Sequence, residues 1–202
     1  LQTPAFSPSI TNSTMFTVVR WDTPSSPESQ YVYNGISDAG RHFLITSTNN
    51  VVYTGSIAPS TNLAANIPGH TIGQPIGPAV MTANYDHSGN GSGLIYNGSV
   101  LSSASGAANQ TFTGLTIGSS VSGTNMYYTS SLKGYIAEMI VYNSVRSTAD
   151  RETIECYLGT KWNLPVDNGT CTPPVPGCNQ GALSSTALSN TTIAFSVFPT
   201  FE

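Results

Sequence analysis

Short apolar runs separated by turn-forming residues recur along the chain as far as Asn143. Examples are "MFTVVRW" at 15–21, "YVYNG" at 31–35, "AVMTANYD" at 79–86 and "YIAEMIVYN" at 135–143. Runs of this length that are rich in β-branched and aromatic residues are typical of β-strands. A spacing of roughly 8–12 residues between them favours an antiparallel sandwich or barrel. We therefore predict an all-β fold.

Two connections carry hairpin signals. Asn97-Gly98 lies inside "LIYNGSVLS", and Asn49-Asn50 separates "RHFLITST" from "VVYTGS". Asn and Gly tolerate positive φ, which two-residue hairpin turns require. The stretch 57–78 contains Pro59, Pro68, Pro75 and Pro78, and it predicts a long surface loop.

One helix is predicted over residues 147–162. Ser147 can cap its N-terminus with Asp150 as the capping-box partner, and Asn163 and Pro165 end it. An apolar stripe follows at helical spacing, formed by Ile154, Leu158 and Trp162 with Tyr157 beside them. The charged residues fall off this stripe: Arg151, Glu152, Glu155 and Lys161. We expect the helix to cover an apolar edge or end of the sandwich.

Only 8% of the 202 residues are charged, and the net charge is −4. The cations are scattered: Arg20, Arg41, Lys133, Arg146, Arg151 and Lys161. No basic stripe exists to bind nucleic acid, and no apolar run is long enough to span a membrane. A surface made polar by hydroxyls and amides is common in extracellular β-proteins, so we predict a secreted or cell-surface protein.

The cysteines lie in the last quarter of the chain, at Cys156, Cys171 and Cys178. An odd count in an exported protein leaves one thiol free or bonded between chains. Cys171 and Cys178 bracket a short loop that a disulfide would close. The alternative joins Cys156 to either of the other two, and we favour it slightly because a link between helix and tail restrains more chain.

The composition changes after Pro165. We expect a sandwich domain over residues 1–165, a Cys/Pro-rich linker over 166–182 and a strand-bearing extension over 183–202. The apolar residues that define the terminal strand are Ile193, Phe195, Val197 and Phe198. An isolated strand does not remain in water with its apolar face exposed, so this one must pair with its own sheet or a neighbour's.

Three segments carry a family likeness: "ANYDHSGNGSGLIYNGSVL", "LTIGSS" and "LKGYIAEMIVYNSVRSTADRETIECYLGTKWNLP". Together they resemble the concanavalin A-like, laminin G-like sandwich modules of large secreted bacterial proteins, over residues 15–165. The resemblance implies a two-sheet antiparallel jelly roll with one C-terminal helix. It says less about function, because this fold hosts lectins, adhesion modules, spacers and glycosidases.

Members of that family begin with a further strand before the segment that matches "LQTPAF", and this chain starts at Leu1. A subunit that lacks its first strand and carries an additional C-terminal strand could insert that strand into the sheet of a neighbouring subunit. The alternatives are that the tail fills the gap in its own sheet, or that the ends of the sequence are arbitrary.

Glu138 is the carboxylate within the apolar run at 133–143. A retaining glycosidase needs two carboxyl groups about 5–5.5 Å apart, and positions two or four residues away on this strand hold no acid. We therefore interpret Glu138 as a buried structural carboxylate that bonds the backbone or a Tyr hydroxyl, and we predict no catalytic residue.

Two further sets are candidate binding residues. Asp86 and Asn84, beside the "HSGNGSG" turn, offer oxygens for Ca²⁺, although a turn-forming Asp needs no metal and we otherwise expect no cofactor. The candidates for stacking on sugars are Trp21, Tyr31, Tyr33, Tyr127 and Tyr128, although aromatics on such strands also form cores.

The sequence thus favours a non-catalytic extracellular subunit that self-associates into a surface fibre or array through its C-terminal strand. The alternative is a carbohydrate-binding adhesion module of a secreted multidomain protein. Binding to nucleic acid is not expected.

Overall fold

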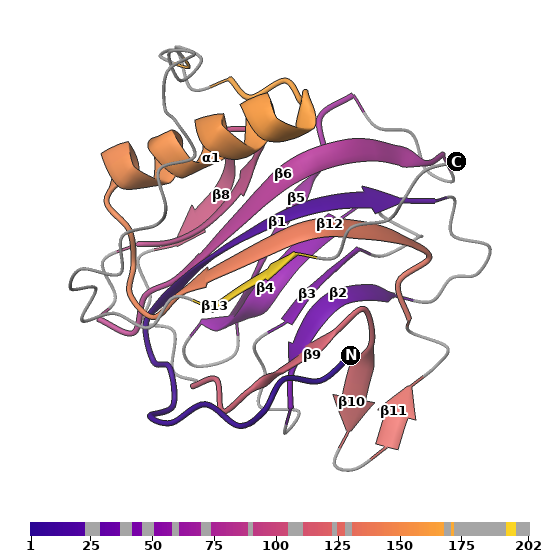
Figure 1. Ribbon diagram of the computed structural model, residues 1–202, viewed down its shortest axis with the longest axis vertical. Helices are drawn as coiled ribbons and strands as arrows, with labels where there is room; N and C mark the ends of the chain where they lie inside the picture. Colours follow the sequence, from indigo (N-terminus) through magenta and orange to yellow (C-terminus); the bar gives the residue numbers. More distant parts are fainter. Residues whose placement is uncertain are drawn as a thin grey trace.

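The protein is a two-sheet antiparallel sandwich with one helix on its outer face (Figure 1). The computed structural model describes residues 1–22, 29–36, 42–45, 51–57, 61–69, 74–88, 91–104, 111–122, 125–127, 131–167, 171 and 193–196.

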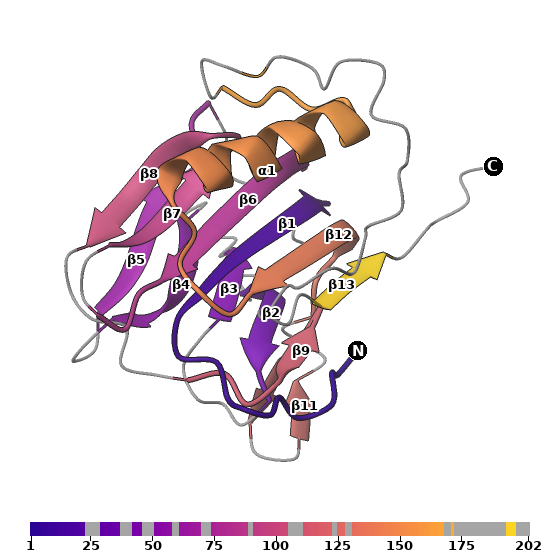
Figure 2. The same cartoon turned by 60° about the vertical axis from the view of Figure 1, so that its left-hand side comes forward.

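Each sheet is named by its strands in spatial order. The six-stranded sheet consists of β13 (Ile193–Ser196), β12 (Gly134–Tyr142), β1 (Ser13–Trp21), β6 (Ile76–Tyr85), β7 (Ser92–Tyr96) and β8 (Ser99–Ala104). The five-stranded sheet consists of β5 (Thr61–Asn66), β4 (Val51–Ile57), β3 (His42–Ile45), β2 (Gln30–Gly35) and β9 (Leu115–Ile117). A separate hairpin pairs β10 (Ser120–Ser122) with β11 (Asn125–Tyr127). Figure 2 shows β8, β7, β6, β1, β12 and β13 side by side.

The predicted all-β class is confirmed, and β1 shows why its sequence fits the centre of a sheet. β1 pairs antiparallel with both β6 and β12, so both of its hydrogen-bonding edges are satisfied within the sheet. Met15 and Val19 belong to the core between the sheets, whereas Phe16 and Val18 pack on the opposite side beneath the helix. Burial on both faces explains why apolar residues occupy consecutive positions in this strand instead of alternating with polar ones.

Aromatic side chains dominate the core between the two sheets. Tyr33 stacks on Phe43 with 5.7 Å between ring centroids, and Tyr85 meets Phe112 edge to face at 5.4 Å. The hydroxyls of Tyr33 and Tyr85 lie 2.9 Å apart across the sandwich. A buried hydroxyl without a partner is costly, and this hydrogen bond satisfies both hydroxyls. It also links the two sheets, because Tyr33 and Tyr85 belong to different sheets.

The helix α1 (Thr148–Trp162) matches the predicted span. The side chain of Ser147 accepts a hydrogen bond from Asp150 N at 3.1 Å, and Asn163 ends the helix in the left-handed conformation. The helix lies across the outer face of the six-stranded sheet, not at an edge or end as expected (Figures 1 and 2). The buried Leu158 packs on Phe16 and Val18, so the second apolar face of the sheet is the surface that the helix covers.

The helix differs from the prediction in its charged face. Arg151 and Glu155, expected off the buried stripe, are both buried, whereas Tyr157 is 47% exposed. Arg151 Nη1 donates to Glu155 Oε2 over 2.7 Å, and the Thr82 hydroxyl of β6 donates to Glu155 Oε1 at the same distance. The pairing satisfies the buried charge, so a polar contact joins the helix to the sheet within an otherwise apolar interface.

The predicted turn at Asn97-Gly98 is confirmed, since it joins β7 to β8 and both residues have positive φ, 47° and 87°. Asn97 Oδ1 also accepts a hydrogen bond from Val80 N at 2.8 Å. The turn predicted at Asn49-Asn50 lies outside the described residues. The long loop predicted over 57–78 is wrong in part, because β5 lies within it and pairs antiparallel with β4. β5 follows closely on β4 in the sequence, and Pro78 lies within β6, so the prolines of this segment do not mark one continuous loop.

The C-terminal strand pairs within its own chain. β13 adds antiparallel to the edge strand β12, with Ile193 opposite Val141 and Phe195 opposite Met139. This is the second of the two predicted arrangements, in which the tail pairs with its own sheet rather than with a neighbour's. Val197 and Phe198 lie outside the described residues.

Candidate functional site

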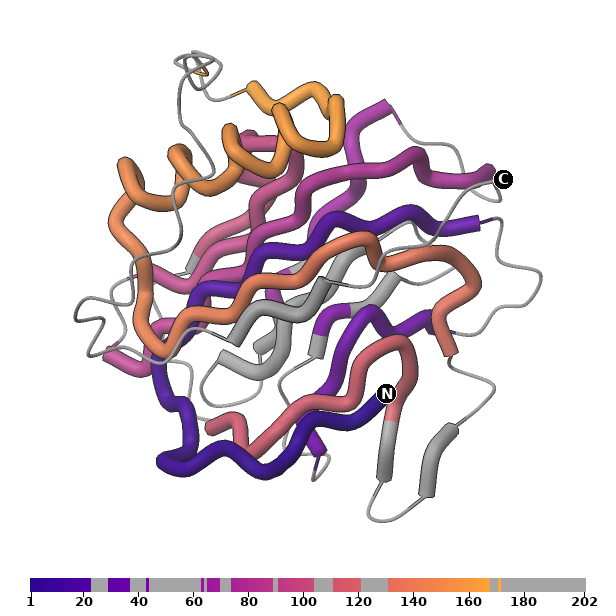
Figure 3. The backbone as a smooth tube through the Cα atoms, in the orientation of Figure 1, coloured from indigo at the N-terminus to yellow at the C-terminus, as the bar shows by residue number. Residues whose placement is uncertain are grey.

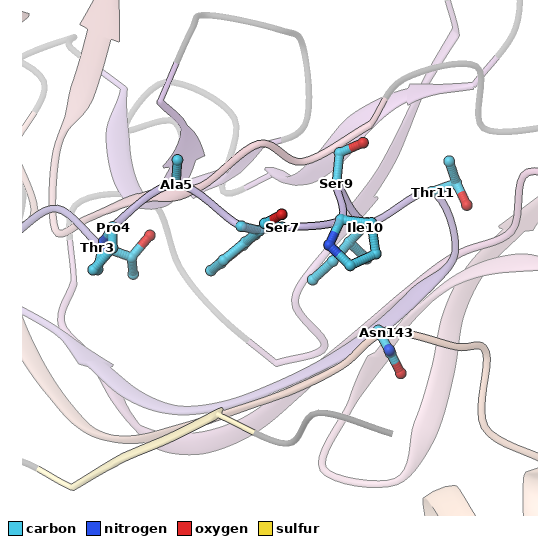
Figure 4. A pocket seen from close by; sticks show the side chains of 10 residues that line it. Thr3, Pro4, Ala5, Ser7, Ser9, Ile10, Thr11 and Asn143 are labelled. Carbon is cyan, nitrogen blue, oxygen red and sulfur yellow. The ribbon is translucent and has the colours of Figure 1, made fainter. Parts of the chain in front are cut away.

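A cavity of about 510 Å³ opens between the N-terminal segment and the end of β12. Its described lining consists of Thr3, Pro4, Ala5, Phe6, Ser7, Pro8, Ser9, Ile10, Thr11 and Asn143. In Figure 4 Asn143 lies across the cavity from the N-terminal segment. Ligand pockets of proteins commonly have volumes of about 300–1,000 Å³, so this cavity is large enough for a small ligand.

The N-terminal segment is held in place along β9, as Figure 3 shows. Thr3 N donates to Leu115 O and Leu115 N donates to the Thr3 hydroxyl, both over 2.9 Å. Farther along, Ile10 and Phe112 exchange two backbone hydrogen bonds of 2.8 Å. The wall of the cavity is therefore bonded to the five-stranded sheet, whereas Asn143 follows the last residue of a strand in the six-stranded sheet.

The cavity presents apolar rings and neutral hydrogen-bonding groups together. Phe6 and Ile10 are half-buried and pack partly on the core, whereas Pro4 and Pro8 are exposed. Hydroxyls and an amide supply the polar groups: Thr3, Ser7, Ser9, Thr11 and Asn143. Such a surface can pack against the apolar face of a ligand and exchange hydrogen bonds with its hydroxyls. Sequence reasoning missed this site, and the only available signal was the lack of any charged residue before Ser13.

Two of the predicted sugar-stacking residues are core residues. Trp21 and Tyr33 are each 1% exposed, and both rings pack on Phe43. They face the interior because β1 and β2 each direct these positions between the sheets, so the stacking prediction is wrong for both. Tyr31 is half-buried on β2. Tyr127 lies in β11, and Tyr128 lies outside the described residues.

Other aromatic side chains reach the surface instead. Tyr135 at the start of β12 is 53% exposed, with the Arg20 guanidinium 5.8 Å from its ring centroid. Arg20 also forms a 3.1 Å ion pair with Asp22. Tyr135 and Trp162 line a smaller hollow of about 160 Å³, whose other walls include Pro78, Ala137 and Leu164. This hollow is below the usual size of a ligand pocket.

Asp86 and Asn84, the candidate calcium ligands, are engaged by protein groups. Asp86 Oδ1 accepts hydrogen bonds from the backbone N, at 2.8 Å, and the hydroxyl of Ser88. Asn84 Oδ1 accepts from the Thr14 hydroxyl at 2.9 Å. Among the described residues, no group of three or more His, Cys, Asp or Glu side chains is placed to hold a metal ion. The Asp86 contacts are those of a turn-forming aspartate.

Glu138 is buried at the junction of β12 and α1. Its Oε2 atom accepts hydrogen bonds from Trp162 Nε1 at 2.8 Å and from Lys161 Nζ at 2.9 Å. The predicted structural carboxylate therefore has helix side chains as partners rather than the backbone or a Tyr hydroxyl. Burial of Lys161 lowers its pKa, but Glu138 and Tyr157 together outweigh that effect through hydrogen bonds and charge and raise the pKa of Lys161 above its ordinary value.

A disulfide joins Cys156 of the helix to Cys171, with 5.3 Å between the two Cα atoms. This confirms the favoured prediction, a disulfide between helix and tail, over the alternative that joins Cys171 to Cys178. Cys178 lies outside the described residues. No helix in the described part of the chain has the length and apolar character needed to cross a bilayer.

Several solved structures share the fold of this chain at low sequence identity. A native heptameric SAP-like pentraxin from Limulus polyphemus matches with a TM-score of 0.55 at 14% identity, over 77% of this chain and 73% of the pentraxin. A putative carbohydrate binding protein from Bacteroides ovatus matches with a TM-score of 0.52 at 12% identity, over 73% of this chain and 42% of that protein. The CBM40 module of the Ruminococcus gnavus IT-sialidase aligns with a TM-score of 0.49 at 14% identity, over 74% of this chain and 95% of the module.

No protein-family model and no curated protein sequence matches the chain. The structural likeness agrees with the concanavalin A-like resemblance seen in the sequence. At identities this low it defines the fold alone, and function must be argued from the residues of this chain.

Proposed function

We propose that this chain is a non-catalytic carbohydrate-binding module of an exported protein. The observation that carries the proposal is the cavity behind the N-terminal segment, where apolar rings and neutral hydrogen-bonding side chains share one surface. A sugar has the matching chemistry, because its ring carries apolar C–H faces and its hydroxyls both donate and accept hydrogen bonds. The fold shared with a putative carbohydrate binding protein supports this reading.

Two further observations support the other parts of the proposal. The Cys156–Cys171 disulfide is typical of proteins that fold in an oxidising compartment, which favours export. The described lining of the cavity contains no carboxylate, and Glu138 is bonded to Lys161 and Trp162. Glycoside hydrolysis by the usual route needs a pair of carboxyl groups, so binding without catalysis fits the site better.

A glycan array with a matched pair of variants tests the proposal. Ala5 is exposed and lines the cavity, so Ala5→Trp should fill the cavity without disturbing the core. Val100 on β8 is 61% exposed, and Val100→Trp adds the same ring at a site outside the cavity lining. We expect Ala5→Trp to abolish glycan binding and Val100→Trp to retain it. An array that stays blank for the unmodified protein would overturn the proposal.

A second candidate function is self-association through the C-terminal strand, in which β13 would form with a neighbour's β12 the ladder that it forms here within its own chain. β13 covers only Glu138–Val141 of β12, which itself begins at Gly134. Residues 172–192 connect Cys171 to β13, and a chain of that length can reach about 70 Å when extended. The same strand can therefore pair with β12 of its own chain or of a neighbour.

Mixed cysteine variants distinguish the two pairings. Ile140 and Ala194 lie directly opposite each other in the β12–β13 ladder. We would mix Ile140→Cys protein with Ala194→Cys protein, both in a Cys178→Ser background, and oxidise the mixture. Exchange of strands between chains predicts a disulfide-linked dimer on a non-reducing gel. If only the double variant forms a bond, and forms it within one chain, strand donation is excluded.

A further inference from the structure

The described lining of the cavity carries no formal charge. Its polar side chains are hydroxyls and one carboxamide, and its remaining side chains are apolar. The side chains of the whole N-terminal segment are neutral as well, because "LQTPAFSPSITN" contains no Asp, Glu, Lys, Arg or His. A ligand in this cavity therefore meets hydrogen-bonding groups without a side chain that could compensate a charge.

The cation nearest to Asn143 in sequence is engaged elsewhere. The Arg146 guanidinium lies 5.0 Å from the centroid of the Tyr142 ring, and its Nη2 donates to the Ser144 hydroxyl. Tyr142 packs in the cluster on the outer face of the six-stranded sheet, beneath the helix. Arg146 is not among the described lining residues of the cavity.

Desolvation decides which ligand such a cavity prefers. Most of the lining residues are exposed, Pro4, Ala5 and Ser9 among them, so a bound ligand keeps part of its water. An ionised group still loses some hydration here and gains no opposite charge in return. A neutral sugar residue avoids that cost, because its hydroxyls exchange water for the Ser, Thr and Asn side chains. Recognition through a bridging Ca²⁺ also needs carboxylate ligands. The described lining contains none.

We propose that the cavity between the N-terminal segment and Asn143 binds a neutral sugar residue by direct contacts, without a metal ion. This inference rests on the proposed carbohydrate-binding function and adds its ligand class. Asn143 supplies an amide that can both donate and accept, and Phe6 and the prolines supply the apolar surface. Acidic glycans such as sialylated, uronic-acid or sulfated chains are then disfavoured at this cavity.

The test uses a panel of neutral and acidic oligosaccharides, measured by calorimetry with the full chain in EDTA and in excess Ca²⁺. We expect binding to be confined to neutral members and unchanged by EDTA. The affinity should also stay within about twofold between about 50 and 500 mM NaCl, because screening has little effect on a neutral ligand. Asn143→Ala should weaken binding by up to about tenfold, the order of one lost hydrogen bond.

Charge substitution at the exposed Ser9 provides the matched control. With a neutral ligand, Ser9→Asp and Ser9→Lys should change the affinity similarly. Binding of acidic glycans alone, a requirement for Ca²⁺, or strengthening by Ser9→Lys with weakening by Ser9→Asp would overturn the neutral-sugar inference but leave carbohydrate binding intact. A panel without any binding would overturn both proposals.

Discussion

The indole Nε1 of Trp162 donates a hydrogen bond to the Glu138 carboxylate over 2.8 Å, which joins the last residue of α1 to the middle of β12. Lys161 Nζ lies 2.9 Å from the same oxygen. Glu138 is only 7% exposed, so its carboxylate has little contact with water. The two donors at the C-terminal end of the helix supply the hydrogen bonds that water would otherwise provide.

Glu138→Ala should therefore lower the free energy of unfolding by about 1–3 kcal/mol, since it leaves the Trp162 N–H without its acceptor. The loss is measurable by urea denaturation monitored by tryptophan fluorescence. Glu152→Ala is the control, because Glu152 is more exposed and pairs with Arg151 over a longer distance of 3.3 Å. Equal effects of the two substitutions would contradict a structural role for Glu138.

The buried pair of Arg151 and Glu155 should behave differently when one member or both are replaced. Glu155→Ala leaves the Arg151 charge and the Thr82 hydroxyl without their acceptor, and we expect a loss of about 3–5 kcal/mol. The double variant Arg151→Met with Glu155→Leu should recover most of that loss, since it replaces the charges by apolar groups. Urea denaturation of both variants checks this, and a double variant less stable than Glu155→Ala would contradict it.

Loss of the disulfide should destabilise the chain through its unfolded state. The bond links residues 15 positions apart, for which loop closure predicts about 3 kcal/mol. Cys171→Ser should lower the melting temperature, and a reducing agent should lower that of the unmodified protein equally. Cys178→Ser is the control, because Cys178 takes no part in this bond. If reduction leaves the melting temperature unchanged, the bond does not contribute to stability.

Gly134 begins β12 where the strand passes close to β1. A Cβ atom added to Gly134 would lie 2.0 Å from the carbonyl oxygen of Arg20, which is too close for any side chain. Gly134→Ala should displace the start of β12 and cost about 1–3 kcal/mol. Gly93→Ala in β7 is the matched control, because its Cβ would meet its nearest neighbour at an ordinary 3.7 Å. Similar melting temperatures for the two variants would contradict the close approach.

Stability should fall at alkaline pH. Burial raises the pKa of Tyr96 and of Tyr142, whereas for Lys161 burial lowers the pKa and the combined effect of Glu138 and Tyr157 raises it further than burial lowers it. In each case the unfolded chain loses its proton first as the pH rises above about 10, so folding is progressively disfavoured from there up to the folded pKa. Urea denaturation between about pH 8 and 11 measures this.

Glu138→Gln separates the lysine contribution from that of the tyrosines. It removes the carboxylate that raises the pKa of Lys161 and leaves Tyr96 and Tyr142 in place, so the alkaline loss of stability should become shallower. An identical slope in the variant would show that Lys161 does not contribute.

Local sequence patterns correctly predicted the helix caps and the hairpin turn, because both depend on contacts between residues that are close in the sequence. Ser147 and Asn163 cap the helix as predicted because capping depends on groups within one turn. Asn97-Gly98 forms its hairpin because the positive φ values belong to those two residues. The site could not be found in this way, because its wall and Asn143 are more than a hundred residues apart.

The sequence by itself determined the all-β class, the strand-to-helix order at the C-terminal part and the absence of a basic surface. Only the tertiary structure decided which face each strand buries, since Trp21 and Tyr33 are equally suited to a core or a binding surface and the second sheet enclosed them. It also decided that Arg151 and Glu155 lie on the buried side of the helix, because Thr82 on a distant strand supplies a donor to Glu155 there. The physical reason is the same throughout: burial and pairing depend on what long-range contacts bring opposite a residue.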